Sequence, residues 1–182
     1  MMGRHTPGTE STMQDIQNHR LGETNELLTL ETAGDHRAVA LAMAQQATRT
    51  LHIFSRDLDH ALFDNPEFEE AASQLARRSQ YARIHILVQD SSAAMRSGHR
   101  LITLAQRLSS RIEIRKPVDE YAVINHAFFV ADETGYISRQ QADRYAGVAN
   151  FYDRLTARDL VGFFNEVWER SQQDSQLRRL YL

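Results

Sequence analysis

The hydrophobic positions of this chain recur in segments whose spacing predicts helices in some places and strands in others. Helical spacing covers about 35–46 and 99–109, and it returns in a long closing segment; Asp35 and Thr156 are the expected caps of the first and last helices. A further helix begins at Asn65-Pro66-Glu67, where a capping side chain, a proline at the first helical position and an acidic first turn coincide. Short apolar runs predict strands at Leu51–Phe54, Arg83–Gln89 and Ile112–Ile114.

Two more strands are expected to form a hairpin, Ala127–Asp132 and Tyr136–Arg139, joined by the turn residues Glu133-Thr134-Gly135. Three leucines between 27 and 30 predict a short edge strand ahead of the first helix. The resulting order is α-β-α-β-α-β-β-β-α. It predicts an α/β fold with a mixed, largely parallel sheet flanked by helices, because strands that alternate with helices are joined by crossover connections.

The first 22 residues are polar and contain few large apolar side chains, so residues 1–22 are expected to form a mobile N-terminal tail. Residues 23–182 then form a single domain, a size that suits one hydrophobic core. The last six residues, Leu177 to Leu182, combine apolar side chains with two arginines. They are expected to dock onto the chain's own domain, because apolar residues at a chain end need cover.

Composition narrows the class of protein further. Apolar residues make up 42% and charged residues 25% of the chain, as in a soluble globular protein, and the net charge is −3. There is no cysteine, which excludes disulfides, thiolate catalysis and cysteine-based zinc sites. No apolar stretch approaches the roughly 20 residues that cross a bilayer. We therefore expect a cytoplasmic protein without a membrane partner.

The hairpin segment from Asn125 to Asp132 reads Asn-His-Ala-Phe-Phe-Val-Ala-Asp. It resembles the strand on which members of the phospholipase D superfamily carry His-x-Lys-x-x-x-x-Asp. When the two patterns are aligned on Asp132, Asn125 stands at the position of the nucleophilic histidine and Ala127 at that of the lysine. The resemblance therefore implies a single-motif member of the superfamily with a degenerate catalytic motif.

Two other features carry the same resemblance, which extends over about residues 35–171. The predicted strand–helix–strand unit resembles the opening of the superfamily's fold, and its second strand ends beside Asp90. The closing helix, which carries Phe164 and Trp168 four residues apart, resembles the superfamily's last helix. The implied fold is the phospholipase D-like α/β sheet. Single-motif relatives pair two halves, so a homodimer is also implied, with the hairpin near the pairing surface.

In active members of the superfamily the histidine attacks phosphorus, the lysine binds phosphate oxygens and the aspartate supports the histidine. Asn125 is a poor nucleophile and Ala127 carries no charge, so the resemblance implies a pseudoenzyme. Many members also carry Gly-Ser-x-Asn seven residues beyond the aspartate, where this chain has Arg139 and Gln140. A similar Gly147-Val148-Ala149-Asn150 follows later, and we interpret it as a displaced remnant.

An alternative keeps an active phosphodiesterase or nuclease, with His126 as the nucleophile and Asp132 as its support. This frame breaks the spacing to the aspartate and turns the side chain to the opposite face of the strand. A third reading makes the chain an accessory module of another enzyme. No pair of histidines has metal-ligand spacing, so neither a metal site nor a cofactor is expected.

Candidate ligand-binding residues follow the strands, because open α/β sheets bind ligands beyond the carboxyl ends of their strands. They are Arg56, Asp57, Asp90, Arg139 and Asn150. A phosphate-bearing ligand or a protein partner fits this set, since arginine binds phosphate through two parallel hydrogen bonds. Nucleic acid is a weaker expectation, because the net charge is negative and the arginines are scattered over several elements.

Overall fold

The computed structural model describes residues 16–174 and 177 of the chain. Within these residues eight strands form one sheet, in the spatial order β1-β7-β6-β5-β2-β3-β4-β8. The strands are β1 (Leu28–Leu30), β2 (Thr50–Ser55), β3 (Arg83–Val88), β4 (Ile112–Lys116), β5 (Ala127–Ala131), β6 (Gly135–Arg139), β7 (Gly147–Asn150) and β8 (Gln172–Gln173).

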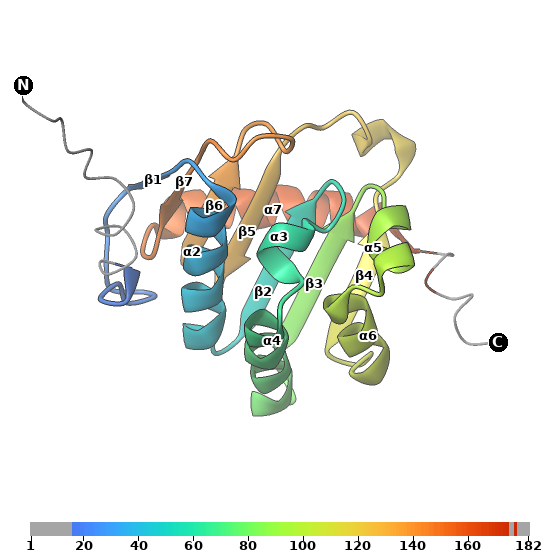
Figure 1. Ribbon diagram of the computed structural model, residues 1–182, viewed down its shortest axis with the longest axis horizontal. Helices are drawn as coiled ribbons and strands as arrows, with labels where there is room; N and C mark the ends of the chain where they lie inside the picture. The colour runs from blue at the N-terminus through green and yellow to red at the C-terminus, as the bar shows by residue number, and fades with distance from the viewer. Residues whose placement is uncertain (1–15, 175–176, 178–182) are drawn as a thin grey trace, which may run out of the picture.

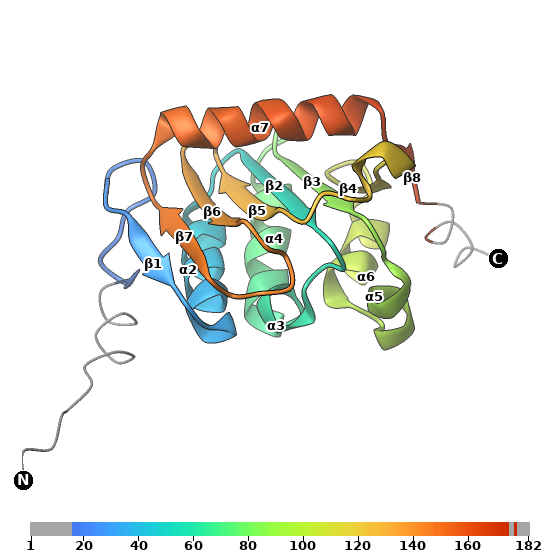
Figure 2. The same ribbon diagram turned by 90° about the horizontal axis from the view of Figure 1, so that it is seen from above.

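Helices cover both faces of this sheet (Figures 1 and 2). They are α2 (Ala33–Gln46), α3 (His60–Phe63), α4 (Pro66–Arg78), α5 (Ser92–Ser97), α6 (Arg100–Arg107) and α7 (Arg154–Glu169), with a single 3₁₀ turn, η1 (Asp119–Tyr121), ahead of β5. Figure 2 shows α2 to α6 on one face and α7 alone across the other. The α/β fold predicted from the sequence, a mixed sheet flanked by helices, is therefore confirmed.

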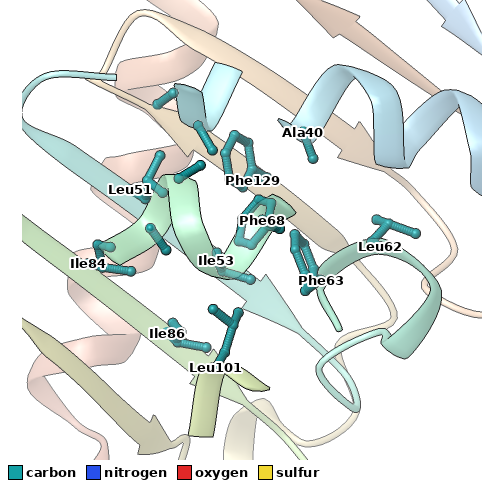
Figure 3. Close-up of a cluster of buried hydrophobic side chains, with 14 of the residues drawn as sticks. Ala40, Leu51, Ile53, Leu62, Phe63, Phe68, Ile84, Ile86, Leu101 and Phe129 are labelled. Carbon is teal, nitrogen blue, oxygen red and sulfur yellow. The ribbon is translucent and has the colours of Figure 1, made fainter. Parts of the chain in front are cut away.

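The sheet is buried on both faces, which explains why its strands read as nearly continuous apolar runs. On the side of α2 and α4, Ile53, Phe68 and Phe129 belong to the larger hydrophobic core (Figure 3). On the other side, Phe128 and Phe164 belong to a second cluster beneath α7. Successive side chains of β5 thus enter different cores, as the two-residue period of a strand requires.

The prediction of a largely parallel sheet is wrong. Only β2–β3 and β3–β4 are parallel pairs, while every other neighbouring pair of strands is antiparallel. The physical reason lies in the connections. Helical crossovers make parallel neighbours of β2, β3 and β4, whereas the short links between β5, β6 and β7 can only reverse the chain.

Two helix caps differ from the expected ones, and a third agrees. Asn65 caps α4 as predicted, accepting a hydrogen bond from the Phe68 amide at 2.9 Å. The N-cap of α2 is Thr32, and Asp35 is its partner in a capping box. The N-cap of α7 is Asp153, which accepts from the amide of Thr156. In both corrected cases the predicted residue takes part in the cap from three positions inside the helix.

The predicted tail boundary at residue 22 comes too late. Ile16 is only 4% exposed and belongs to the main core. The Leu21 amide donates to Oε1 of Gln46 at 2.8 Å, and the Gly22 amide donates to the Phe151 carbonyl at 2.9 Å. A few anchoring contacts outweigh the polar composition of this segment. Residues 1–15 lie outside the described part of the chain.

At the other end, Leu177 packs against the main core, in agreement with the docking expected for the C-terminal segment; residues 178–182 lie outside the described residues. No helix among the described residues is long and apolar enough to cross a bilayer.

Candidate functional site

The start of β5 lies beside the carboxyl end of β2, because the two strands are antiparallel and Phe128 pairs with Phe54. Phe129 and Ala131 face the layer of α2 and α4, while Phe128 and Val130 face α7. By the same alternation Ala127 points toward the first layer and His126 toward the second. The carboxyl end of β2 is also where open α/β sheets bind ligands.

Ala127 lies under a buried arginine. It is 4% exposed and pairs in register with Arg139 of β6. Nη1 of Arg139 forms an ion pair with Oδ2 of Asp59 at 3.1 Å, and only 6% and 11% of the two side chains are exposed. The position of the superfamily's lysine is thus uncharged, and the nearest positive charge comes from the neighbouring strand and is already neutralised.

Tyr145 completes the surroundings of this ion pair. Its hydroxyl donates to Oδ1 of Asp59 at 3.4 Å, and its ring lies 5.2 Å from the Arg139 guanidinium carbon. Burial raises the pKa of the tyrosine, and so does the nearby Asp59 carboxylate. The carboxylate therefore has two side-chain donors, and the arginine has both an anion and an aromatic face.

His36 of α2 packs beside the Arg139–Asp59 pair and Tyr145. Its Nε2 lies 2.7 Å from the Tyr145 carbonyl oxygen, and its side chain is fully buried. Burial lowers the pKa of His36, and the positive charge of Arg139 lowers it further, so the ring is neutral near pH 7. A cavity of about 20 Å³ remains beside His36, Ser55, Ala127 and Arg139. That volume suits a water molecule and is too small for a phosphate.

Asn125 serves the loop that follows β6. The Ala142 amide donates to its side-chain Oδ1 at 3.2 Å and to its main-chain carbonyl at 3.0 Å. The side chain is exposed, and an amide has neither a titratable proton nor useful nucleophilicity. At the nucleophile's position the chain therefore carries a residue that pins backbone.

His126 points to the other face of the sheet, toward α7. Its Nε2 lies 2.8 Å from Oγ of Ser138, and its ring centroid lies 5.2 Å from that of Phe128. Burial lowers the pKa of His126, which favours the neutral ring. The histidine is therefore separated from the Arg139–Asp59 pair by the sheet itself.

Asp132 lies at the opposite end of β5, about 20 Å from His126 for six extended residues. Its carboxylate accepts hydrogen bonds from the amides of Thr48, Arg49 and Thr50 at 2.8–2.9 Å, and from the Thr48 hydroxyl at 3.1 Å. The alternative in which Asp132 supports His126 is not favoured by this geometry, because the carboxylate is engaged by backbone amides far from the histidine. Asp132 holds the turn between α2 and β2.

Of the other candidate residues, Arg56, Asp57 and Asp90 are exposed near the ends of β2 and β3. The Asp90 amide donates to the Arg56 carbonyl at 2.8 Å, which ties the two loops together. Hydrogen bonds from Ser92 lower the pKa of Asp90. These three residues therefore share one edge of the sheet, but none of them enters the buried cluster around Arg139.

Asn150 is not brought to this site. It pairs with Tyr136, near the Asp132 end of the sheet, and its side chain binds the amides of Glu26 at 3.3 Å and Tyr152 at 3.0 Å. A side-chain bond to Asn25 at 2.9 Å completes its role as a brace for the N-terminal segment.

Sequence reasoning missed three members of the cluster: His36, Asp59 and Tyr145. Asp59 could have been suspected, since it follows β2 at the binding edge. His36 and Tyr145 come from a helix and a loop more than a hundred residues apart, and no local pattern marks them. Among the described residues, no three histidine, aspartate or glutamate side chains gather as they would around a metal ion.

The fold is a phospholipase D-like α/β fold, as the solved structures below show. The chain belongs to the family described as a domain of unknown function, DUF7931, which matches residues 32–180. No curated protein matches the chain.

Solved structures support the same class. Nuc from Salmonella typhimurium, a phospholipase D family member, aligns with a TM-score of 0.59 and 12% identity, over 81% of this chain and 96% of that one. NucT from Helicobacter pylori aligns with a TM-score of 0.55 and 10% identity, over 82% and 98%. TrmBL2, an archaeal chromatin protein with a novel mode of DNA binding, gives a TM-score of 0.62 and 12% identity over 90% of this chain. The present chain spans only 59% of TrmBL2.

Proposed function

We propose that this chain is a non-catalytic phospholipase D-like module, a pseudoenzyme that acts by binding or scaffolding. One observation carries the proposal: the position of the superfamily's lysine is a buried Ala127 beneath the Arg139–Asp59 ion pair, with room left for only a water molecule. A phosphodiester cannot approach β5 on this face unless the ion pair separates.

The chemistry of the neighbouring residues supports the same conclusion. Phosphoryl transfer through a covalent intermediate needs a nucleophile, and a positive charge aimed at the phosphate oxygens. Asn125 provides no nucleophile, and Asp59 already neutralises Arg139. His126 is bonded to Ser138 on the opposite face of the sheet, so it and Arg139 cannot act on one phosphorus atom.

Hydrolysis assays test this proposal directly. Purified chain and the His126→Ala variant are compared on bis(4-nitrophenyl) phosphate and on a nuclease gel, with an active phospholipase D family nuclease as positive control. We expect both forms to match the buffer blank. Turnover that disappears in His126→Ala would overturn the proposal in favour of a His126 phosphodiesterase. Turnover that survives in His126→Ala but disappears in Arg139→Ala would overturn it in favour of chemistry at the buried cluster.

Restoring the motif is a second arm of the same test. The double variant Asn125→His, Ala127→Lys recreates the superfamily's spacing to Asp132. We expect it to remain inactive, because the new lysine would lie against the buried Arg139 guanidinium and has no cavity to occupy. Recovered hydrolysis would mean that the Arg139–Asp59 pair does not block the site.

The partner proposed for the module is a second copy of the chain. The pairing rests on the resemblance to single-motif relatives, and Val123, 86% exposed in the loop that leads into β5, is the position we choose to test it. Sedimentation velocity on the chain and on Val123→Asp tests the pairing; a dimer that dissociates in the variant is expected, and a monomeric parent chain would contradict it. A phosphate-bearing ligand at the cluster would have to displace Asp59 from Arg139.

A further inference from the structure

A groove of about 210 Å³ lies between α6 and β4, at the edge of the sheet opposite β1. Its apolar lining comes from Ile102 and Ala105 of α6 and from Ile112 and Ile114 of β4. The groove stays open because β4 has only a two-residue neighbour, β8, which pairs with Arg115 and Lys116 and leaves the rest of β4 uncovered. No further helix follows α6 on this face within the described chain, as Figure 1 shows.

The C-terminal segment reaches this groove along a defined path. After α7, β8 pairs with the end of β4, and the buried Asp174 then accepts a hydrogen bond from the Ser91 hydroxyl. The Leu177 amide donates to the Asp174 carbonyl at 3.0 Å, and the Leu177 side chain lines the groove. The described part of the chain thus ends with a leucine already seated in the groove.

We propose that residues 178–182, Arg-Arg-Leu-Tyr-Leu, occupy the remainder of this groove in the same molecule. The segment starts where Leu177 is seated, so little chain must be ordered to reach the cavity. Leu180 follows Leu177 by three positions, the spacing that brings two side chains to one face of a helical turn. The two leucines together supply the apolar side chains that the lining of α6 and β4 requires.

The charges of the groove and the segment are complementary. None of the described residues that line the groove is basic; of its two carboxylates, Glu113 pairs with Arg115 at 2.7 Å, and the buried Asp174 accepts from the Ser91 hydroxyl. Arg178 and Arg179 follow Leu177 directly. An apolar groove without basic lining residues among those described therefore suits a segment in which two arginines stand between leucines, and the chemistry recognised is that of a short basic, leucine-rich peptide.

The absence of native cysteine permits a direct test in the full chain. The double variant Gln106→Cys, Leu180→Cys places one thiol on the groove side of α6 and one on the segment. Gln45→Cys, Leu180→Cys is the matched control, because Gln45 is exposed on α2, beyond α4 from the groove (Figure 1). After mild oxidation at low protein concentration, we expect at least tenfold more intramolecular disulfide in the Gln106 variant than in the control.

Mixing isotope-labelled and unlabelled protein before oxidation separates the alternatives. Disulfides within one copy support the proposal. Disulfides between labelled and unlabelled copies would overturn it in favour of exchange with a second copy. Equal yields in the two variants, or no disulfide in either, would also overturn it. A labelled peptide of residues 175–182 gives an independent readout: it should bind the Leu180→Asp chain at least tenfold more tightly than the parent chain, and equal binding would contradict self-occupation.

Discussion

The two ends of β5 are held by different kinds of contact. At one end Asp132 holds three backbone amides of the turn before β2. At the other end Asn125 and Ala127 stand where the superfamily keeps its reacting residues, and Arg139 and Asp59 fill the space. Of the three positions aligned with the superfamily's motif, Asp132 binds backbone amides, whereas Asn125 and Ala127 carry uncharged side chains.

The difference follows from what each substitution would leave behind. Removing the Asp132 carboxylate would take away the acceptor of three amides at the start of β2. Replacing a lysine by alanine at 127 creates a space that a neighbouring strand can fill, and Arg139 lies directly across the hairpin.

The largest expected effect is at the Arg139 end. Arg139→Ala leaves the Asp59 carboxylate nearly buried without its cation, which should lower the free energy of unfolding by about 3–5 kcal/mol. Urea denaturation measures the change. The control is Arg139→Met combined with Asp59→Asn, which removes both charges and should recover much of the loss. A loss below about 1 kcal/mol for Arg139→Ala would mean that the ion pair is not a structural replacement for the catalytic residues.

The next largest effect concerns His52, which lies in β2 beside the middle of β5. Burial, and secondarily the nearby His85, lowers the pKa of His52 to about 4. In the unfolded chain His52 is protonated below about pH 6.5, whereas in the folded chain it is protonated only below about pH 4. Stability should therefore fall as the pH falls through this window, by about 3 kcal/mol from this group.

Denaturation midpoints between pH 7 and 4 check this prediction in the parent chain and in His52→Leu. The variant should lose the part of the acid dependence that His52 contributes and keep the rest, because burial also lowers the pKa of His36, His85 and His99; His126→Asn, at the half-buried start of β5, should lose less than His52→Leu. If His126→Asn removes the dependence of the denaturation midpoint on pH and His52→Leu does not, the acid sensitivity comes from His126 and the prediction is contradicted.

A smaller loss is expected at the Asp132 end. Asp132→Ala removes the acceptor of three amides at a partly exposed site, so the free energy of unfolding should fall by about 2–3 kcal/mol. Glu133→Ala is the matched control, because Glu133 shares the positive φ of the turn (54° against 52°) and is exposed. Thermal unfolding of both variants decides the point: equal losses would show that the turn itself, rather than the carboxylate, carries the stability.

The smallest effect belongs to Asn125. Asn125→Ala removes one exposed side-chain acceptor for the Ala142 amide, and the main-chain carbonyl of Asn125 still accepts from it. We expect a loss of less than about 1 kcal/mol. If Asn125→Ala lowered the free energy of unfolding as much as Asp132→Ala in the same denaturation experiment, the two ends of β5 would not differ as proposed. Asn125 would then contribute to stability as much as Asp132.

Local patterns predicted most of the secondary structure. The Asn65-Pro66-Glu67 signal fixed the start of α4, since all its determinants lie within one turn of the chain. Short elements such as α3, β7 and β8 escaped prediction because they are stabilised by their neighbours rather than by their own periodicity. The direction of several strands was mispredicted, because local periodicity does not show which strands are joined by hairpins and which by helical crossovers.

The site divides in the same way. The sequence by itself determined that Asn125 and Ala127 stand where a motif aligned on Asp132 would have its histidine and lysine, and that the chain has no cysteine. It could not reveal that Arg139 pairs with Asp59, that Asp132 bonds to the turn before β2, or that His126 faces α7. Those facts depend on strand register and on loop packing between distant segments. Residue identity is local, whereas the partner of a buried charge is set by the tertiary structure.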